Sequence, residues 1–484
     1  MDTKEFIEKI NILEKKLNLC ALRYVDFNPW PHIRISVFNR WNLTYTQEAT
    51  KHKKRKIDVS LKLKHFFYSV IYYLKNQIKP QSVDVVYFTR MDWFEQNING
   101  KCFNKHSDSF LSIFSEKYLV KVIEMGPISP TSDLYTKDKI YISILLKFAR
   151  LRSTIASYIG SNLDRNNMDL PVTNEINKEI SRVFDFNVEY IDGLRRIDTY
   201  ARLFERILSK YNPKAVFLEC FYYEYGMAIS LACHRLGINC VEYQHGAPNN
   251  YQLMYARWNN IPNEGYETIP SVFWMWGDSP RKVIDHWMCK TQAHRTIVGG
   301  NLWMIYYKTY YSNKNLNLKK HYKSGRVNIL VTLYGDEYFP EYLLNTILCF
   351  SNNHYWHFRN HPTNPISTEL KNKILALPNT EIEFSSNALL FDLFPASDIH
   401  ITGYSTAAFE AQSFEIPTIF THINAKNGYS DLIGRNGLYY TNNEKKASDL
   451  IKKLSISKQK IHPEYIVSDV NIAYSAMSKI MKVV

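Results

Sequence analysis

Short apolar runs separated by helix-length segments make up most of the chain after residue 82. In the first half of the chain these runs occupy residues 83–88, 119–123, 215–220 and 240–243. Each is rich in β-branched and aromatic residues, which is typical of a strand buried within a sheet. Most of residues 136–212, and residues 225–236, have the length and apolar spacing of helices. This alternation predicts a doubly wound α/β sheet of parallel strands.

A second series of the same kind follows a polar segment. Residues 312–326 are basic and lack apolar periodicity, so we interpret them as an interdomain linker. Further strands are predicted at residues 327–333, 355–359, 398–402 and 418–420, with a helix at 341–349. We expect a helical N-terminal segment (1–80), a first Rossmann-like domain (81–311) and, after the linker, a second (327–484). Two such domains place a ligand crevice between them, at the carboxyl ends of their strands.

The composition is that of a folded protein with no segment that crosses a membrane. Hydrophobic residues make up 45% of the 484 positions, and the seven cysteines include no CxxC pair that would indicate a metal knuckle. The longest apolar stretch, residues 66–74, is far shorter than the roughly 20 residues of a spanning helix. Residues 1–19 lack the apolar region of a signal peptide. We expect a cytoplasmic protein.

The sequence is unusual in having many more basic than acidic residues. The net charge is +14, and the densest cluster is Lys-His-Lys-Lys-Arg-Lys at residues 51–56. Nucleic acid is not the expected partner, because neither zinc-finger spacing nor an RNA-recognition motif accompanies the charge. The anionic inner face of the cell membrane is a better candidate, since each basic residue near it contributes about 1 kcal/mol. We expect a peripheral location there, with a solvated basic surface as the alternative.

Residues 397–420 have the pattern of a phosphate site. A predicted strand ends at Thr402, Gly403 allows a tight turn, and Ser405 or Thr406 is placed to cap the helix that follows. The start of that helix offers backbone N–H groups and a positive dipole end, which bind phosphate. Glu410 lies one turn inside, where its carboxylate can accept hydrogen bonds from ribose hydroxyls. The alternative is a capped helix with a solvated glutamate.

A histidine stands at the end of another predicted strand. His361 follows the strand at residues 355–359, and Pro362 restricts its backbone. A side chain at this place projects into the crevice. There it can hydrogen-bond or protonate a phosphate oxygen as the leaving group departs.

Together these two segments resemble the HP and S/T motifs of bacterial sialyltransferases and polysialyltransferases. Capsular Kdo transferases and teichoic-acid glycerophosphotransferases carry similar elements, and residues 409–419 resemble the GT-B pattern in which a glutamate holds ribose. The resemblance covers residues 327–425 well and 215–310 moderately. It implies a GT-B fold in which His361, Pro362, Ser405, Thr406 and Glu410 hold the nucleotide, often CMP or CDP. Gly300 and Gly335 are further donor-side candidates, because glycine lets a backbone approach a ligand closely.

A Gln-His-Gly element follows the strand at residues 240–243 and is similar to one in many surface-polysaccharide enzymes. Its His245 is a candidate general base or acceptor ligand, and Gln244 a candidate acceptor ligand. Arg257 and Trp258, in an aromatic-rich stretch downstream, suit the face of a sugar. Core packing is an equally good interpretation of these aromatics.

The acidic triplet that supplies the base in sialyltransferases is missing from this chain. Glu219, at a strand end, is the first choice of base in its place, with Glu224 and His245 behind it. Aromatic neighbours desolvate such a carboxylate and raise its pKa, which suits a base near neutrality.

These features predict a glycosyltransferase of surface-polysaccharide synthesis. It would move a sugar from a nucleotide-sugar, CMP-activated and acidic by preference or UDP-activated, to a saccharide or polyprenyl-linked acceptor. Asp336 and Glu337 stand alone, so we expect no metal and no cofactor, and inversion if a carboxylate is the base. The alternatives are a CDP-glycerol-type glycerophosphotransferase and a non-catalytic carbohydrate- or nucleotide-binding partner in capsule assembly.

Overall fold

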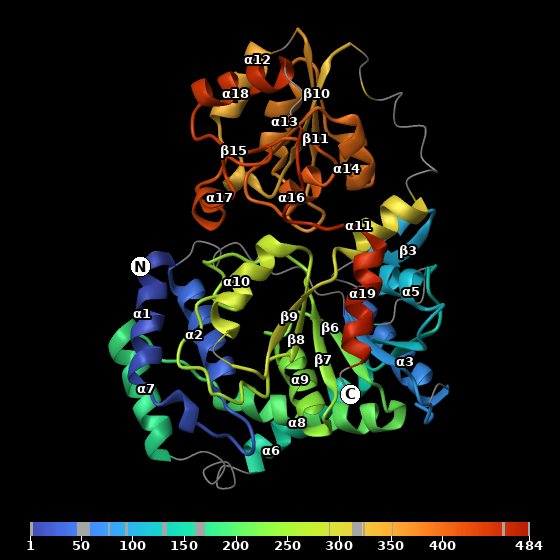
Figure 1. The fold of residues 1–484 in the computed structure, drawn as a ribbon, viewed down its shortest axis with the longest axis vertical. Helices are drawn as coiled ribbons and strands as arrows, with labels where there is room; N and C mark the ends of the chain where they lie inside the picture. The colour runs from blue at the N-terminus through green and yellow to red at the C-terminus, as the bar shows by residue number, and fades with distance from the viewer. Residues whose placement is uncertain are drawn as a thin grey trace. The chain divides into compact units, whose positions relative to one another are not determined.

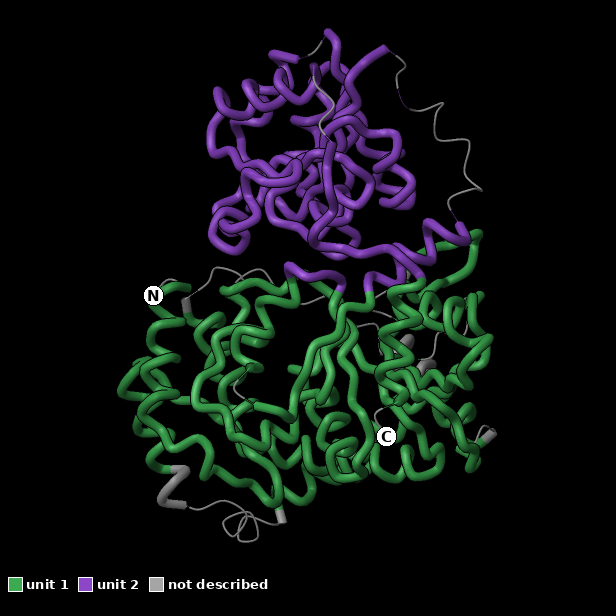
Figure 2. The backbone as a smooth tube through the Cα atoms, in the orientation of Figure 1, with its two compact units in different colours: residues 1–275, 280–299, 471–484 green, residues 276–279, 300–470 purple. Residues whose placement is uncertain are grey.

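The computed structural model forms two compact units (Figure 2). Unit 1 consists of residues 1–275, 280–299 and 471–484, and unit 2 of residues 276–279 and 300–470. The residues described are 3–45, 59–75, 78–91, 95–127, 133–159, 170–289, 291–311, 322, 325–350, 352–456 and 460–482. The basic run at 51–56 and most of the expected linker lie outside them.

Unit 1 is built on a seven-stranded parallel sheet (Figure 1). Its order is β5-β4-β1-β6-β7-β8-β9, so the chain builds outward in one direction from β1 and then in the other from β6. The strands are β1 (Val85–Thr89), β4 (Val120–Glu124), β5 (Lys139–Tyr141), β6 (Ala215–Glu219), β7 (Asn239–Tyr243), β8 (Val272–Met275) and β9 (Arg295–Val298). A separate hairpin pairs β2 (Glu95–Ile98) with β3 (Lys101–Asn104).

Amphipathic helices enclose this sheet. On α8, Ile197, Ala201, Phe204 and Leu208 form a buried stripe at helical spacing. The helices are α1 (Thr3–Lys16), α2 (Trp30–Tyr45), α3 (Val59–Lys75), α5 (Ser107–Phe114), α6 (Ser143–Ile159), α7 (Leu170–Phe184), α8 (Ile191–Tyr211), α9 (Glu224–Leu236), α10 (Asp278–Met288) and α19 (Val470–Met481).

The N-terminal helices are part of this core, which corrects the expected separate segment at residues 1–80. The ring of Phe6 on α1 stacks on Trp41 of α2, with centroids 4.5 Å apart. Arg34 and Glu14 form a buried ion pair at 2.8 Å. Such groups cannot be left without their partners in an isolated helical arm, because each would expose apolar surface or bury a lone charge.

Unit 2 repeats the architecture with six parallel strands in the order β12-β11-β10-β13-β14-β15. They are β10 (Val327–Thr332), β11 (His354–Arg359), β12 (Thr380–Glu381), β13 (Ile399–Thr402), β14 (Thr418–Phe420) and β15 (Leu438–Tyr440). The helices are α11 (Leu302–Tyr306), α12 (Tyr342–Cys349), α13 (Thr368–Leu375), α14 (Glu383–Asn387), α15 (Leu390–Leu393), α16 (Ala407–Gln412), α17 (Ile423–Gly428) and α18 (Glu444–Ile456). The expected pair of doubly wound, Rossmann-like sheets is confirmed.

The unit boundaries differ from those drawn on the sequence. Helix α19 packs in unit 1, where the Tyr474 hydroxyl donates to the Ile113 carbonyl at 2.7 Å. Residues 300–311 belong to unit 2, where the Tyr307 hydroxyl donates to Asp392 at 2.7 Å. Within the expected linker, Tyr322 is buried and stacks on His357 with centroids 4.1 Å apart. No helix among the described residues is long and apolar enough to cross a membrane.

Candidate functional sites in the two units

Each sheet has a point where the strand order reverses, and this is where ligands bind in open α/β sheets. In unit 1 it lies between β1 and β6, and in unit 2 between β10 and β13. The carboxyl ends of these strands are occupied by Thr89, Glu219, Thr332 and Thr402. Each unit therefore presents polar side chains at its switch point.

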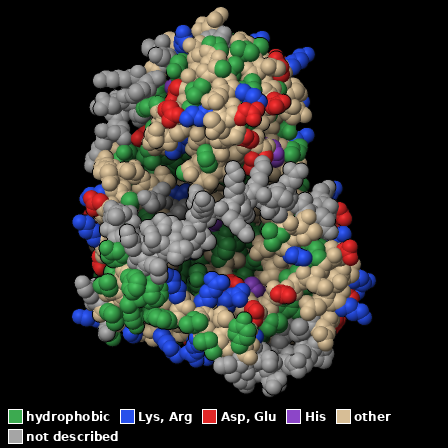
Figure 3. Space-filling view, turned by 180° about the vertical axis from the view of Figure 1, so that it is seen from behind, with side chains coloured by type: hydrophobic (Ala, Val, Ile, Leu, Met, Phe, Trp, Pro, Cys, Tyr) green, Lys and Arg blue, Asp and Glu red, His purple; other side chains and the backbone are tan. Residues whose placement is uncertain are grey.

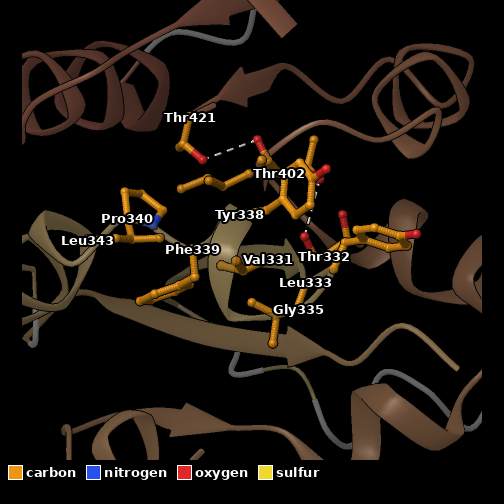
Figure 4. A pocket seen from close by; sticks show the side chains of 13 residues that line it. Val331, Thr332, Leu333, Gly335, Tyr338, Phe339, Pro340, Leu343, Thr402 and Thr421 are labelled. Atoms are coloured by element: carbon orange, nitrogen blue, oxygen red, sulfur yellow. Dashed lines mark hydrogen bonds between the residues drawn. The ribbon is translucent and has the colours of Figure 1, made fainter. Parts of the chain in front are cut away.

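In unit 2 a hollow of about 250 Å³, counting its open mouth, lies at this point (Figure 4). Thr332 and Thr402 close one side, and the turn at Gly335 and the segment around Tyr338 close another. Gly335 has φ +69°, a conformation that glycine adopts without strain. A side chain at Gly403 would lie 2.7 Å from the carbonyl oxygen of Tyr338, so the turn after β13 requires glycine.

His361 stands beside this hollow. It follows β11, and its ring lies edge-on to Tyr334, a lining residue, with centroids 4.7 Å apart. The Thr363 hydroxyl lies 3.1 Å from Nδ1 of His361. Pro362 is exposed. The strand-end position expected for the histidine is the one observed.

The turn from β13 into α16 carries the expected S/T pair. Ser405 Oγ accepts a hydrogen bond from the Ala407 amide at 3.2 Å, and Thr406 occupies the N-cap position without a side-chain capping bond. The chain reaches both residues directly from Thr402 and Gly403, which line the hollow. Glu410 is buried on α16 rather than solvated.

The sequence interpretation did not assign Arg359, the last residue of β11, to a site. Its guanidinium donates to the carbonyl oxygens of Ser385 and Ala388. Burial lowers the pKa of Arg359 to about 10, while the charge of Glu410 opposes the shift. Arg359 therefore stays charged at neutral pH and places a positive group near Glu410. Its position just before Asn360-His361-Pro362 was the available signal.

In unit 1, Glu219 lies at the switch point inside a polar cluster. Both of its oxygens accept from the Thr89 hydroxyl, at 2.8 and 3.0 Å, and the Asn104 amide donates to that hydroxyl at 2.9 Å. Nδ1 of His106 is 3.7 Å from Glu219. Burial raises the pKa of Glu219 well above its usual range. This shift favours the protonated form of Glu219, which weakens it as a general base.

A second buried carboxyl, Glu242 of β7, was missed by the sequence interpretation. Its Oε1 accepts from the Tyr255 hydroxyl at 2.5 Å and lies 3.7 Å from Nδ1 of His245. Burial raises the pKa of Glu242 to about 8 and lowers that of His245 to about 4. The Tyr222 hydroxyl is 3.3 Å from Nε2 of His245. At neutral pH the pair therefore holds its proton on Glu242 and keeps His245 neutral.

Glu224 has a structural environment that argues against its role as a base. Its two oxygens accept from the Arg196 guanidinium at 2.7 and 2.9 Å. This bidentate pairing occupies the carboxylate and ties the start of α9 to α8.

The three residues expected to bind the acceptor, Gln244, Arg257 and Trp258, lie in different environments. Trp258 is buried under the Arg34 guanidinium, 4.1 Å from the ring centroid, and is a core residue rather than a sugar platform. Arg257 is exposed, with φ +59°, and donates to the Asn250 carbonyl at 2.8 Å. Gln244 is buried and donates to the Gly246 carbonyl at 2.7 Å, which shapes the turn that carries His245.

At Gly300, contacts within the protein require a residue without a side chain. A side chain there would lie 2.7 Å from the carbonyl oxygen of Val467. The close approach at Gly300 is thus to the chain's own backbone and not to a ligand.

Among the residues that the structure describes, no three His, Cys, Asp or Glu side chains are grouped as a metal ion requires.

Solved structures share this architecture. The UDP-GlcNAc 2-epimerase from Methanocaldococcus jannaschii matches with a TM-score of 0.51 and 11% identity, over 82% of this chain and 99% of that one. A putative UDP-N-acetylglucosamine 2-epimerase from Listeria monocytogenes gives a TM-score of 0.52 and 11% identity, over 82% and 96%. The fold is GT-B.

At this identity the likeness establishes the GT-B fold and not the reaction. No protein-family model matches the sequence, and no curated protein matches it. These structures support the GT-B part of the resemblance seen in the sequence and give no support to its sialyl- or Kdo-type branch.

Proposed function

We propose that this GT-B protein is a glycosyltransferase that uses a nucleotide-sugar donor. The observation that carries the proposal is the hollow at the switch point of unit 2, beside a strand-end histidine and next in the chain to a Ser-Thr turn. Hydroxyls, backbone amides and an imidazole at one sheet edge suit the phosphates of a nucleotide.

In the proposed reaction unit 2 holds the nucleotide and unit 1 supplies the base. His245 accepts the proton of the acceptor hydroxyl, whose oxygen forms the new bond to the anomeric carbon. The bond from that carbon to the donor phosphate breaks, and its electron pair stays on the phosphate oxygen. His361 and the Ser405-Thr406 turn stabilise the developing charge by hydrogen bonding. A single displacement of this kind inverts the anomeric centre.

The order of the candidate bases follows from protonation. A base must be deprotonated at the working pH. Burial raises the pKa of Glu219 well above its usual range and so favours its protonated form, whereas burial lowers the pKa of His245 to about 4 and keeps it neutral. We therefore place His245 first, with the carboxyl of Glu242 3.7 Å from its Nδ1.

The substrates proposed remain those of the sequence resemblance. The donor is a CMP-activated acidic sugar or a UDP-sugar, and the acceptor a saccharide or polyprenyl-linked saccharide of a surface polysaccharide. Such an acceptor places the enzyme at the inner face of the cell membrane.

Titration calorimetry with CMP, CDP, UDP and GDP tests the nucleotide site on the full chain. Thr406→Val should weaken the preferred nucleotide about tenfold, the usual effect of losing one hydrogen bond to a charged group. Glu410→Gln should reduce the preference for ribose over deoxyribose. Thr368→Val and Glu369→Gln make the same changes at the exposed start of α13 and should leave binding intact.

The corresponding activity panel uses CMP-, CDP-, UDP- and GDP-activated substrates. Release of nucleotide that depends on a saccharide acceptor supports transfer. Conversion of the sugar without acceptor would replace the transferase with an epimerase on the same fold. If nucleotide affinity is unchanged by both unit 2 substitutions, the site lies elsewhere and the proposal fails.

A further inference from the structure

The outer faces of α3 and α6 in unit 1 carry large apolar side chains that are exposed to solvent. On α3, Leu74 is 66% exposed, and on α6, Tyr158 is 86% exposed. The complete set consists of Phe67, Tyr68, Ile71, Leu74, Phe148, Leu151, Ile155 and Tyr158. We call this set the α3–α6 face. Single exposed apolar residues are ordinary on a protein surface, but eight on two neighbouring helices indicate a binding surface.

The spacing shows that each helix presents one continuous stripe. On α3 the exposed positions 67, 71 and 74 are four and three residues apart, and on α6 positions 148, 151, 155 and 158 repeat the same intervals. Residues at these intervals lie on one side of a helix. The α3–α6 face is thus the apolar side of two amphipathic helices.

The opposite sides of the helices are held down by specific contacts. Ser69 of α3 is buried, with its hydroxyl 3.1 Å from that of Ser143 on α6. The Tyr72 hydroxyl donates to the Lys139 carbonyl at 2.7 Å, and its ring packs edge-on against Tyr141. These contacts fix the rotation of α3, so its apolar stripe faces outward in the folded protein.

The two stripes adjoin each other. The ammonium group of Lys147 on α6 lies 5.2 Å from the ring centroid of Phe66 on α3, which bridges the helices. Figure 3, seen from behind, shows hydrophobic side chains gathered at the lower left, with Lys and Arg side chains along the border. In Figure 1 this is the side of unit 1 that carries α3.

The charged residues of α3 and α6 themselves are all basic, while Asp192 of α8 lies at the edge of the face, with its carboxylate 3.3 Å from the Ser157 hydroxyl of α6. Neither helix contains an Asp or Glu, although the chain has 46 of them. Lys147, Arg150 and Arg152 are exposed on α6. The basic run at residues 51–56 precedes the first residue of α3 by only a few positions in the chain.

We propose that the α3–α6 face docks unit 1 onto an anionic lipid bilayer, with both helices lying in the plane of the headgroups. Apolar side chains then enter the acyl boundary while the surrounding cations meet anionic headgroups. A second copy of the chain is a poor occupant, because the exposed cations Lys147, Arg150 and Arg152 on α6 would approach the same cations of the other copy. This inference concerns a surface distinct from the switch points and does not depend on which donor is used.

Vesicle co-sedimentation tests the proposal on the full chain, with phosphatidylcholine vesicles with and without phosphatidylglycerol. The protein should bind the anionic vesicles, and salt should weaken the binding. The double substitution Phe148→Ser/Leu151→Ser should reduce the partition coefficient tenfold or more, since it removes two inserting side chains. Arg150→Gln/Arg152→Gln should reduce it several-fold and reduce its salt dependence.

The matched control is Leu348→Ser/Ile456→Ser, which removes two exposed apolar side chains from α12 and α18 of unit 2. It should bind vesicles like the original protein, and all variants should keep their nucleotide affinity and melting temperature. Equal vesicle binding by the α6 double variant would overturn the proposal. So would a dimer in sedimentation velocity that the α6 substitutions dissociate, since the face would then be a protein interface.

Discussion

Two buried carboxyls in unit 1 show how a single strand position decides a side chain's chemistry. In the register of β6 and β7, Glu219 pairs with Tyr243, whereas Glu242 pairs with Leu218. Because neighbouring residues on a strand point to opposite faces, the two carboxyls lie on opposite faces of the sheet. Glu219 joins Thr89 and His106, while Glu242 joins Tyr255 and His245.

The pKa of Glu242 predicts a stability that falls with rising pH. Its value of about 8 lies above the ordinary 4.5, so the folded protein binds an extra proton between these values. This contribution is fully present below about pH 4.5 and is lost as the pH rises through about 8. The Glu242→Gln side chain cannot ionise, so the variant should lose less stability between pH 5 and pH 8 than the original protein does. The fall in melting temperature from pH 5 to pH 8 should therefore be a few degrees smaller in the variant. Thermal unfolding at both pH values measures the difference.

Glu116→Gln, at an exposed position of unit 1, is the control and should not alter the pH dependence. A Glu242→Gln protein with an unchanged difference between the two pH values would show that Glu242 is ionised in the folded state.

His361 allows a clean separation of activity from stability. The side chain lies beside the hollow, and it is not part of the buried core. His361→Ala should lower turnover about 100-fold or more, as loss of an acid or phosphate ligand does, with a small change in melting temperature. His462→Ala changes an exposed histidine of unit 2 and should retain full turnover. Near-normal turnover in His361→Ala would exclude this histidine from the mechanism.

At the scale of elements, the strands that the sequence placed most accurately are buried along nearly their whole length. β1, β6 and β10 are mainly apolar, and each lies within a residue or two of its expected place. β9 was missed because it is an edge strand with a mostly half-buried pattern. β8 was not among the predicted strands, although core packing was one interpretation of the aromatic-rich stretch downstream of residue 246; its Phe273 and Trp274 are core residues.

Site residues that follow a strand could be predicted from the sequence, and those that depend on tertiary contacts could not. His361, Ser405 and Thr406 follow strands directly, so strand assignment alone places them at the carboxyl edge of a sheet. The pairing of Glu242 with His245 depends on how β7 enters its turn, and no local pattern encodes that geometry. Trp258 and Glu224 were misassigned because their partners, Arg34 and Arg196, come from helices far away in the sequence.

At the scale of the whole molecule, the chain passes between the two units more than once. It enters unit 2 at residue 276, returns to unit 1 at 280, leaves again at 300 and comes back at 471. The last segment is α19, whose Ala473, Ala476, Met477 and Ile480 are buried. The sequence interpretation placed this helix in the second domain, because chain order is the only guide when tertiary contacts are unknown.

This arrangement predicts where a C-terminal truncation acts. A chain that ends at Asp469 loses the contacts of Tyr474 with Ile113 and Phe114 of α5. Hydrogen exchange should therefore accelerate in α5 and β7 of unit 1 while β10 and β13 of unit 2 keep their protection. Tyr474→Phe removes only one hydrogen bond and should cost about 1 kcal/mol, far less than the truncation. Equal acceleration in both units would contradict the assignment of α19 to unit 1.

The return of α19 to unit 1 also sets an order of events during synthesis on the ribosome. All of residues 276–470 leave the exit tunnel before α19 does, so unit 2 is complete first. Unit 1 begins folding earlier, yet its surface at α5 stays uncovered until α19 emerges. A nascent chain of this protein therefore carries an unfinished first unit throughout the synthesis of its second, and that interval is when chaperones have the most apolar surface to protect.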